Sequence, residues 1–181
     1  MYDDSCNGTW LLMKNIYEER AWNSSAYNSY EASPIHSYLN STFLDLLDIK
    51  DVIRQAKIPY VDGTGGSAVA SGVNGLPAKV FLLSGYEVGW TYSGTPVDGA
   101  KLPYFESGTG SPAQNKRIAY LNGEATAWWL RSPDTSDTYD VKLVTFTGDV
   151  SITNASSSYG IRPAFIVPLD TLVDSNNNIV V

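Results

Sequence analysis

The sequence predicts one α+β domain in which two or three short helices come early and antiparallel strands come late. A length of 181 residues corresponds to a single domain. Apolar residues recur at helical spacing in the first third of the chain, whereas apolar strand-like runs separated by turn signals fill the last third. Only 17% of residues are charged, and Gly, Ser, Thr and Asn are abundant, which is typical of a β-rich, loop-rich protein. This order favours α+β over a repeated βαβ arrangement.

The first elements expected are one strand and two short helices. Residues 8–13 follow a turn signal and form the strand, and residues 23–30 form a loop. Ser33 is a good N-cap and Pro34 suits the first helical position, so a helix begins there. Its predicted core face consists of Ile35, Leu39, Phe43, Leu46 and Leu47. Asp48 is expected to cap a second short helix with apolar positions up to residue 56.

The middle of the chain is expected to be mostly loop. Pro59 biases residues 57–60 toward an extended conformation, and residues 62–75 read as a long loop. Residues 79–83 form an apolar run that predicts a buried strand. Ser84 and Glu87 have the spacing of a capping box and predict the start of a third helix. Residues 90–113 again read as loop.

The last third is expected to contain hairpins. Asn122-Gly123 is a strong turn dipeptide between apolar runs at 118–121 and 127–130. Residues 141–146 and 150–152 flank Gly148-Asp149 and predict a second hairpin, and residues 161–167 form the last strand. We expect residues 1–172 to form the domain and residues 173–181 to be a tail or linker.

Composition excludes several classes of partner. The net charge is −7 and no cluster of Lys and Arg occurs, so neither nucleic acid nor an anionic membrane surface is expected as a partner. No apolar run approaches 18 residues, which argues against membrane insertion. Cys6 is the one cysteine, so an internal disulfide and a cysteine-rich zinc site are both excluded.

Two apolar, aromatic segments enclose a polar segment in the last third of the chain. We call Trp128–Pro133 and Gly160–Phe165 the frame; each contains one arginine. Of the 26 residues between them, 134–159, 10 are Ser or Thr and 4 are Asp. Binding residues tend to lie on loops that a rigid scaffold positions, and hydroxyl and tyrosine side chains suit adaptable recognition. The segment therefore predicts a ligand-binding surface; the alternative is ordinary hairpin surface.

The predicted contacts are polar and exposed-strand positions of this segment. If one strand alternates, Tyr139, Lys142, Val144 and Thr147 are candidates, although the register is open. The full set of expected ligand-binding residues is Asp134, Ser136, Asp137, Tyr139, Asp140, Lys142, Val144, Thr145, Thr147, Asp149, Ser151, Thr153, Asn154 and Ser156.

The frame residues are expected to be structural. These are Trp128, Trp129, Arg131, Arg162 and Phe165. The two arginines could contact a ligand, but a buried guanidinium that bonds several oxygens is the favoured interpretation. Because neighbouring strand residues point to opposite faces, one of Trp128 and Trp129 should enter the core and the other should be partly exposed.

The inventory of reactive side chains does not favour an enzyme. His36, the one histidine, is interpreted as a structural or surface residue, and no Ser-His-Asp or Cys-His pairing is suggested. The four aspartates of 134–159 could supply oxygen ligands to calcium, but plain solvated carboxylates are the favoured interpretation. We therefore expect no metal and no cofactor.

The order of several segments resembles a family of uncharacterised domains from gut bacteria and their phages that look like C-type lectin folds. The resemblance covers about residues 8–170. It rests most specifically on the two frame segments, and also on Tyr38-Leu39-Asn40 with Phe43, on residues 80–84 with Glu87, and on Gly148.

The resemblance implies a lectin-like scaffold whose ligand face lies between the two arginine-containing segments. Members of this broad fold group include variable proteins of diversity-generating retroelements and binding modules of phage tails or cell surfaces. A ligand-binding domain of a phage tail or bacterial surface protein is therefore expected. Its ligand would be a host- or cell-surface protein or glycan, and its oligomeric state would come from the parent protein.

Two alternatives stay open. The fold group also includes formylglycine-generating enzymes, so the chain could be such an enzyme or a remnant of one. Cys6 alone cannot support their two-cysteine chemistry. A purely structural virion domain is the other alternative, and it predicts self-association in place of a foreign ligand.

Overall fold

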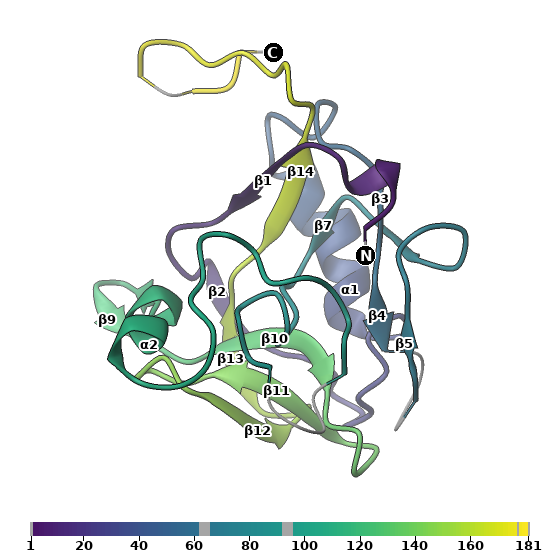
Figure 1. Ribbon diagram of the computed structural model, residues 1–181, viewed down its shortest axis with the longest axis vertical. Coiled ribbons are helices and arrows are strands. Elements are labelled where there is room, and N and C mark those ends of the chain that lie inside the picture. The colour runs from purple at the N-terminus through teal and green to yellow at the C-terminus, as the bar shows by residue number, and fades with distance from the viewer. Residues whose placement is uncertain (1, 62–65, 92–95, 177, 181) are drawn as a thin grey trace.

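The computed structural model describes residues 2–61, 66–91, 96–176 and 178–180. It confirms an α+β architecture, with short helices and several β-sheets that are mostly antiparallel (Figure 1). Within these ranges, no helix has the length and apolar character that crossing a lipid bilayer requires. The chain beyond residue 168 leads away from the rest of the fold, and Val173 and Ile179 form an isolated bridge there.

The largest sheet has five strands and carries the segment predicted to bind ligand. Its strand order is β12 (Val150–Asn154), β11 (Asp140–Val144), β10 (Trp128–Pro133), β13 (Ser158–Ile161) and β2 (Glu18–Ala21). Neighbouring strands are antiparallel, except that β10 and β13 run parallel. The β11–β12 hairpin is the one that the sequence predicted. In contrast, the polar strand β2 was not predicted.

A smaller sheet lies beside the first and pairs a strand from the first part of the chain with one from the last part. Its order is β1 (Thr9–Leu12), β14 (Ala164–Val167) and β7 (Val80–Phe81), and both pairings are antiparallel. Arg162 and Pro163 connect β13 of the large sheet to β14 of the small one. The second frame segment therefore passes from one sheet to the other.

The first helix begins where the sequence predicted. Helix α1 (Pro34–Tyr38) is capped by Ser33, whose Oγ accepts a hydrogen bond from the His36 amide at 3.2 Å, and it continues as a π-helical turn over Leu39–Phe43. Ile35, Leu39 and Phe43 are buried as expected. Leu46 is 60% exposed, so its predicted core position is wrong, because the helical segment ends at residue 45.

The second predicted helix is absent. Residues 48–53 form turns and lead into β3 (Ala56–Ile58), which pairs with β6 (Leu76–Ala78). Ser84 and Glu87 do form the reciprocal capping bonds, at 2.9 and 3.0 Å, yet only turns follow over residues 85–89. The predicted third helix is therefore also wrong at this place.

Short elements occur in regions that were expected to be loops. Helix α2 (Ser111–Arg117) begins within the predicted loop 90–113, of which residues 92–95 lie outside the described residues. Likewise β5 (Ala68–Val69) lies inside the predicted loop 62–75 and pairs with β4 (Tyr60–Val61). Residues 62–65 of that predicted loop lie outside the described residues. The Asn122-Gly123 turn is confirmed: both residues have positive φ, 52° and 90°, and they join β8 (Tyr120–Leu121) to β9 (Glu124–Ala125).

Both faces of the central strand are covered, so the frame lies wholly in the core. All six residues of β10 are buried, and Trp128 and Trp129 have no exposed surface. The expectation that one of these tryptophans is partly exposed is therefore wrong. Trp129 packs edge-on against the Tyr159 ring at 5.1 Å between centroids and donates from Nε1 to the Arg20 carbonyl at 2.8 Å. The frame forms a rigid base for the segment between its two parts.

Candidate ligand-binding surface

Arg131 fixes the first half of the frame through a fully buried ion pair. Its Nη1 and Nη2 each lie 2.6 Å from one carboxylate oxygen of Glu87, and neither side chain is exposed. Nε donates to the Pro59 carbonyl at 2.9 Å and Nη2 donates to the Asp98 carbonyl at 2.7 Å. A bidentate pair with these additional bonds is the geometry in which a buried charge is well compensated. These are the contacts that a structural residue would make.

Two further polar groups extend this network. Ser132 donates from Oγ to Asp98 Oδ2 at 2.6 Å and accepts from the Gly85 amide at 2.8 Å. Burial is the largest influence on Asp98 and raises the pKa of its carboxyl, against the opposing effects of Arg131 and Ser132. The phenol of Tyr2 donates to Glu87 Oε1 at 2.5 Å. In the sequence, Glu87 stood out as a capping residue and as part of the family resemblance, but not as a partner of Arg131, and nothing in the sequence indicated Asp98.

The second frame arginine is held quite differently. Arg162 is 5% exposed, and its Nε donates to the Met13 carbonyl at 2.8 Å. Its guanidinium lies 5.1 Å from the centroid of the Trp128 ring. No carboxylate pairs with it in the described part of the chain, and its Nη1 is buried without a hydrogen-bond partner.

The loop that follows the first frame segment is closed by a side chain from a distant part of the chain. Asn28 is fully buried, and its Nδ2 lies 3.0–3.1 Å from the carbonyl oxygens of Asp134, Asp137 and Asp140. The backbone N–H of Asn28 also donates to the Thr138 carbonyl at 3.1 Å. Because one buried side chain contacts so many carbonyls, it defines the shape of loop 134–140. Sequence analysis placed Asn28 only in a loop and did not identify this role.

The aspartates of this loop stabilise local turns. Asp134 Oδ1 accepts from the amide and the hydroxyl of Ser136, both at 2.8 Å, and Asp137 Oδ1 accepts from the amides of Tyr139 and Asp140 at 2.8 and 2.7 Å. Burial, and then the charges of Asp137 and Asp134, raise the pKa of Asp140. Across the described ranges, His, Cys, Asp and Glu side chains form no group of three that could hold a metal ion.

The hairpin that follows is anchored at its turn by helix α2. Gly148 has φ +83°, and a β-carbon built there would lie 2.1 Å from the Gln114 carbonyl oxygen, so this position requires glycine. Gln114 Nε2 also donates to Asp149 Oδ2 at 2.9 Å, and the buried Arg117 donates to the Gly148 carbonyl at 3.3 Å. The turn at Thr145 and Thr147, whose hydroxyls lie 2.8 Å apart, is therefore held in a defined position.

Burial divides the predicted contact residues into three groups. Val144 is fully buried and Lys142 is 8% exposed, because both faces of β11 are covered; these two candidates are wrong as surface contacts. The half-buried candidates are Asp134, Asp137, Asp140, Thr145, Asp149, Thr153 and Asn154. The exposed ones are Ser136, Tyr139, Thr147, Ser151 and Ser156.

We define the exposed hairpin surface as every exposed residue of 134–159. These residues are Thr135, Ser136, Thr138, Tyr139, Phe146, Thr147, Ser151, Ile152, Ser156 and Ser158. Tyr139, Phe146 and Ile152 are 49%, 62% and 46% exposed, so the surface combines hydroxyl groups with large apolar side chains. Phe146 and Ile152 were not predicted. Phe146 lies in the turn between β11 and β12, and the consecutive residues Ser151 and Ile152 are both exposed, so β12 has no single buried face.

Comparisons with known proteins identify a family but no function. The model of a family described as "Domain of unknown function (DUF6273)" matches residues 7–169. Neither a curated protein nor a solved structure matches the chain.

Proposed function

The chain belongs to the DUF6273 family, and we propose that it is a ligand-recognition domain that binds through the exposed hairpin surface. The observation that carries the proposal is the contrast between this surface and the buried frame beneath it. Hydroxyl-rich and aromatic side chains are exposed on a loop and hairpin, whereas Asn28, Arg131 and Gly148 fix the backbone that presents them. A backbone that is already fixed loses little conformational entropy on binding.

The chemistry of the surface suits a protein or glycan ligand. Hydroxyl groups donate and accept hydrogen bonds, and Tyr139 and Phe146 offer rigid apolar contact area of the kind that dominates binding energy. β12 is at the sheet edge and the surface residues are exposed, so a large partner can reach them. Such a surface matches recognition of a cell-surface macromolecule better than enclosure of a small one.

We further propose the C-type-lectin-like scaffold and the setting that the resemblance implies, a phage tail or a bacterial surface protein. In this setting the surface is a candidate for retroelement diversification. Diversification would have to spare Lys142 and Val144, because both are buried in the central sheet.

A cell-binding assay tests the proposal. The fluorescently labelled domain is applied to a panel of intact Gram-positive and Gram-negative gut bacteria, and binding is measured by flow cytometry. The test variant carries Tyr139→Ala, Phe146→Ala and Ile152→Ala together. Its control carries Leu169→Ala and Leu172→Ala, which remove large apolar side chains that are also exposed, at 69% and 70%, but lie outside the surface.

We expect saturable binding of the wild type to at least one strain, binding at least tenfold weaker for the test variant, and unchanged binding for the control. Each exposed substitution changes stability by about 0.5 kcal/mol or less, so both melting temperatures should stay within about 6 °C of the wild type. Absence of binding across the whole panel, or equal binding by the test variant, would contradict the proposal.

A further inference from the structure

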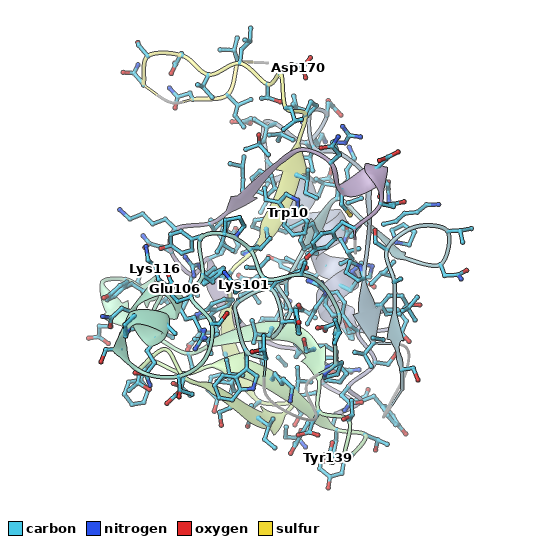
Figure 2. All side chains as sticks on the ribbon, viewed as in Figure 1. Trp10, Lys101, Glu106, Lys116, Tyr139 and Asp170 are labelled. Carbon is cyan, nitrogen blue, oxygen red and sulfur yellow. The ribbon has the colours of Figure 1, made fainter. Side chains whose placement is uncertain are left out.

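A second candidate site lies away from the exposed hairpin surface. An open cavity of about 850 Å³ lies between strand β1, the start of β14 and the segment 100–105. This volume is within the range of roughly 300–1,000 Å³ that small organic ligands occupy. Figure 2 shows Trp10 and Lys101, two of its lining residues, far from Tyr139, which lies at the other end of the molecule. A ligand in the cavity would therefore not touch the exposed hairpin surface.

Most of the lining is apolar and aromatic. Trp10 forms one wall, with its ring 4.9 Å from that of Tyr2 and 5.3 Å from that of Phe81, between centroids. Tyr104 and Phe105, whose rings meet edge to face at 5.0 Å, form another wall. Rings arranged edge to face favour an aromatic or aliphatic body packed between them.

The charged residues of the lining all carry the same sign. Lys14, Lys101 and Arg162 line the cavity, and no Asp or Glu does. The whole chain has 19 acidic and 12 basic residues, so a lining with three cations and no acid departs from its overall character. None of these three cations takes part in an ion pair within the described residues. The cavity therefore favours an anionic ligand.

Arg162 is the cation that most lacks a counter-charge. It is 5% exposed, and Nη1 is buried with no hydrogen-bond partner. Burial lowers the pKa of its guanidinium to about 10, because only the weak influence of Tyr104 opposes the loss of water. A buried donor without a partner is uncommon in native proteins and costs stability, so its presence beside a cavity points to a ligand that supplies the acceptor.

We propose that this cavity binds a small organic carboxylate with an aromatic body, whose carboxylate pairs with Arg162 while the body packs against Trp10 and Phe105. The planar guanidinium matches a carboxylate in a two-point geometry. A monoanion also loses less hydration than a phosphate dianion would in a cavity with so many apolar walls. Lys14 and Lys101 are exposed and attract the anion toward the entrance.

Titration calorimetry with defined probes tests this site on the whole chain. The probes are 3-phenylpropionate, its neutral amide 3-phenylpropionamide, and inorganic phosphate. We expect saturable binding of the carboxylate, at least tenfold weaker binding of the amide, and no displacement of the carboxylate by equimolar phosphate. Equal binding of the amide, or displacement by phosphate, would overturn the assigned ligand class, and no carboxylate binding would overturn the site.

Two variants localise the binding. Arg162→Gln removes the proposed anchor, and Ala100→Trp fills the entrance from an exposed loop position without changing Arg162. Arg54→Gln is the matched control, because it removes a guanidinium outside the cavity whose Nη2 donates to the Asp4 carbonyl at 3.4 Å.

Carboxylate affinity should fall at least tenfold in both test variants and stay unchanged in Arg54→Gln, with melting temperatures recorded for all three. If Arg162→Gln does not fold, Ala100→Trp decides the question, because its substituted side chain lies on the surface. Unchanged affinity in Ala100→Trp would place the carboxylate elsewhere and overturn the proposal. Failure here would leave the cell-binding result unaffected, since the two sites share no residue.

Discussion

Arg131 and Arg162 occupy matched positions in the two frame segments, yet their guanidinium groups have different surroundings. Arg131 is neutralised by Glu87, which lies 44 positions away in the sequence. Arg162 has one backbone acceptor and no acid. Sequence analysis treated the two alike, because what distinguishes them is the partner that folding brings to each. Of the pair, only Arg162 retains an unused donor that a ligand could satisfy.

His36 contributes a pH dependence of stability that can be predicted from its burial. Burial lowers its pKa from 6.5 to about 4, and its ring packs 5.1 Å from that of Tyr30. The unfolded chain therefore binds a proton that the folded chain does not bind between these two pH values. Stability from this residue is fully present above pH 6.5 and is lost as the pH falls toward 4.

The variant His36→Gln isolates this effect. The unfolding free energy of the wild type minus that of the variant should fall by about 1–3 kcal/mol as the pH falls from 7 to 4.5. Urea denaturation at several pH values measures the difference, in which the titration of other groups cancels. If the wild-type value minus the variant value stays constant or rises on acidification, His36 is not neutral in the folded protein.

Elements with strong local signals were predictable, whereas those that depend on distant partners were not. The Ser33 cap, the Asn122-Gly123 turn and the β11–β12 hairpin are set by residues close in sequence, and all three are confirmed. Strand β2 is polar and forms only because β13 pairs with it. The capping box at Ser84 and Glu87 forms without a helix, and the same carboxylate also binds the distant Arg131.

Asn28 should control the order of loop 134–140 without controlling the sheet. Replacing it with Ala removes the donor that contacts three loop carbonyls, at a cost of about 1–3 kcal/mol. In Asn28→Ala, the amides of residues 137–140 should exchange with deuterium at least tenfold faster than in the wild type. Amides of Leu143 and its neighbours in β11 should keep their protection.

The matched control for this experiment is Asn154→Ala. Asn154 is also an asparagine of this region, but within the described residues its side chain hydrogen-bonds to Ser156 alone, through Oδ1 at 3.0 and 2.7 Å. Exchange in loop 134–140 should be unchanged in the control. If Asn28→Ala exchanges like the wild type, other contacts hold the loop; if the whole sheet loses protection, Asn28 supports the fold and not the loop.

At the scale of the molecule, the frame joins two sheets and separates two candidate binding regions. Its first segment is the central strand of the large sheet, and its second passes through Arg162 into the small sheet. The β11–β12 hairpin of the exposed hairpin surface belongs to the large sheet (Figure 1), whereas residues of β1 and β14 in the small sheet line the cavity. One rigid unit can therefore present a macromolecular surface and a small-molecule cavity independently.

Sequence analysis located the candidate surface but did not resolve which side chains it exposes. Composition identified residues 134–159 as polar, and eight exposed Ser, Thr and Tyr residues do lie there. Strand alternation predicted Lys142 and Val144 as contacts and missed Phe146, because both faces of β11 are covered by the rest of the fold and Phe146 lies in the turn after it. The cavity was not foreseen, since its lining comes from segments distant in sequence, such as β1 and residues 100–105.

The central claim is that recognition and folding are carried by different residues of 128–165. A scan of all single substitutions over this range, with each variant displayed on yeast, tests this claim most directly. Resistance of the displayed variant to protease measures folding. Capture of the yeast by the bacterial strain that the wild type binds measures recognition. We expect positions of the exposed hairpin surface to tolerate substitution in the folding measurement and to lose capture, and positions of β10 and β11 to lose both. If the capture-specific positions lie outside 134–159, or if the exposed positions affect capture only through folding, the claim is wrong.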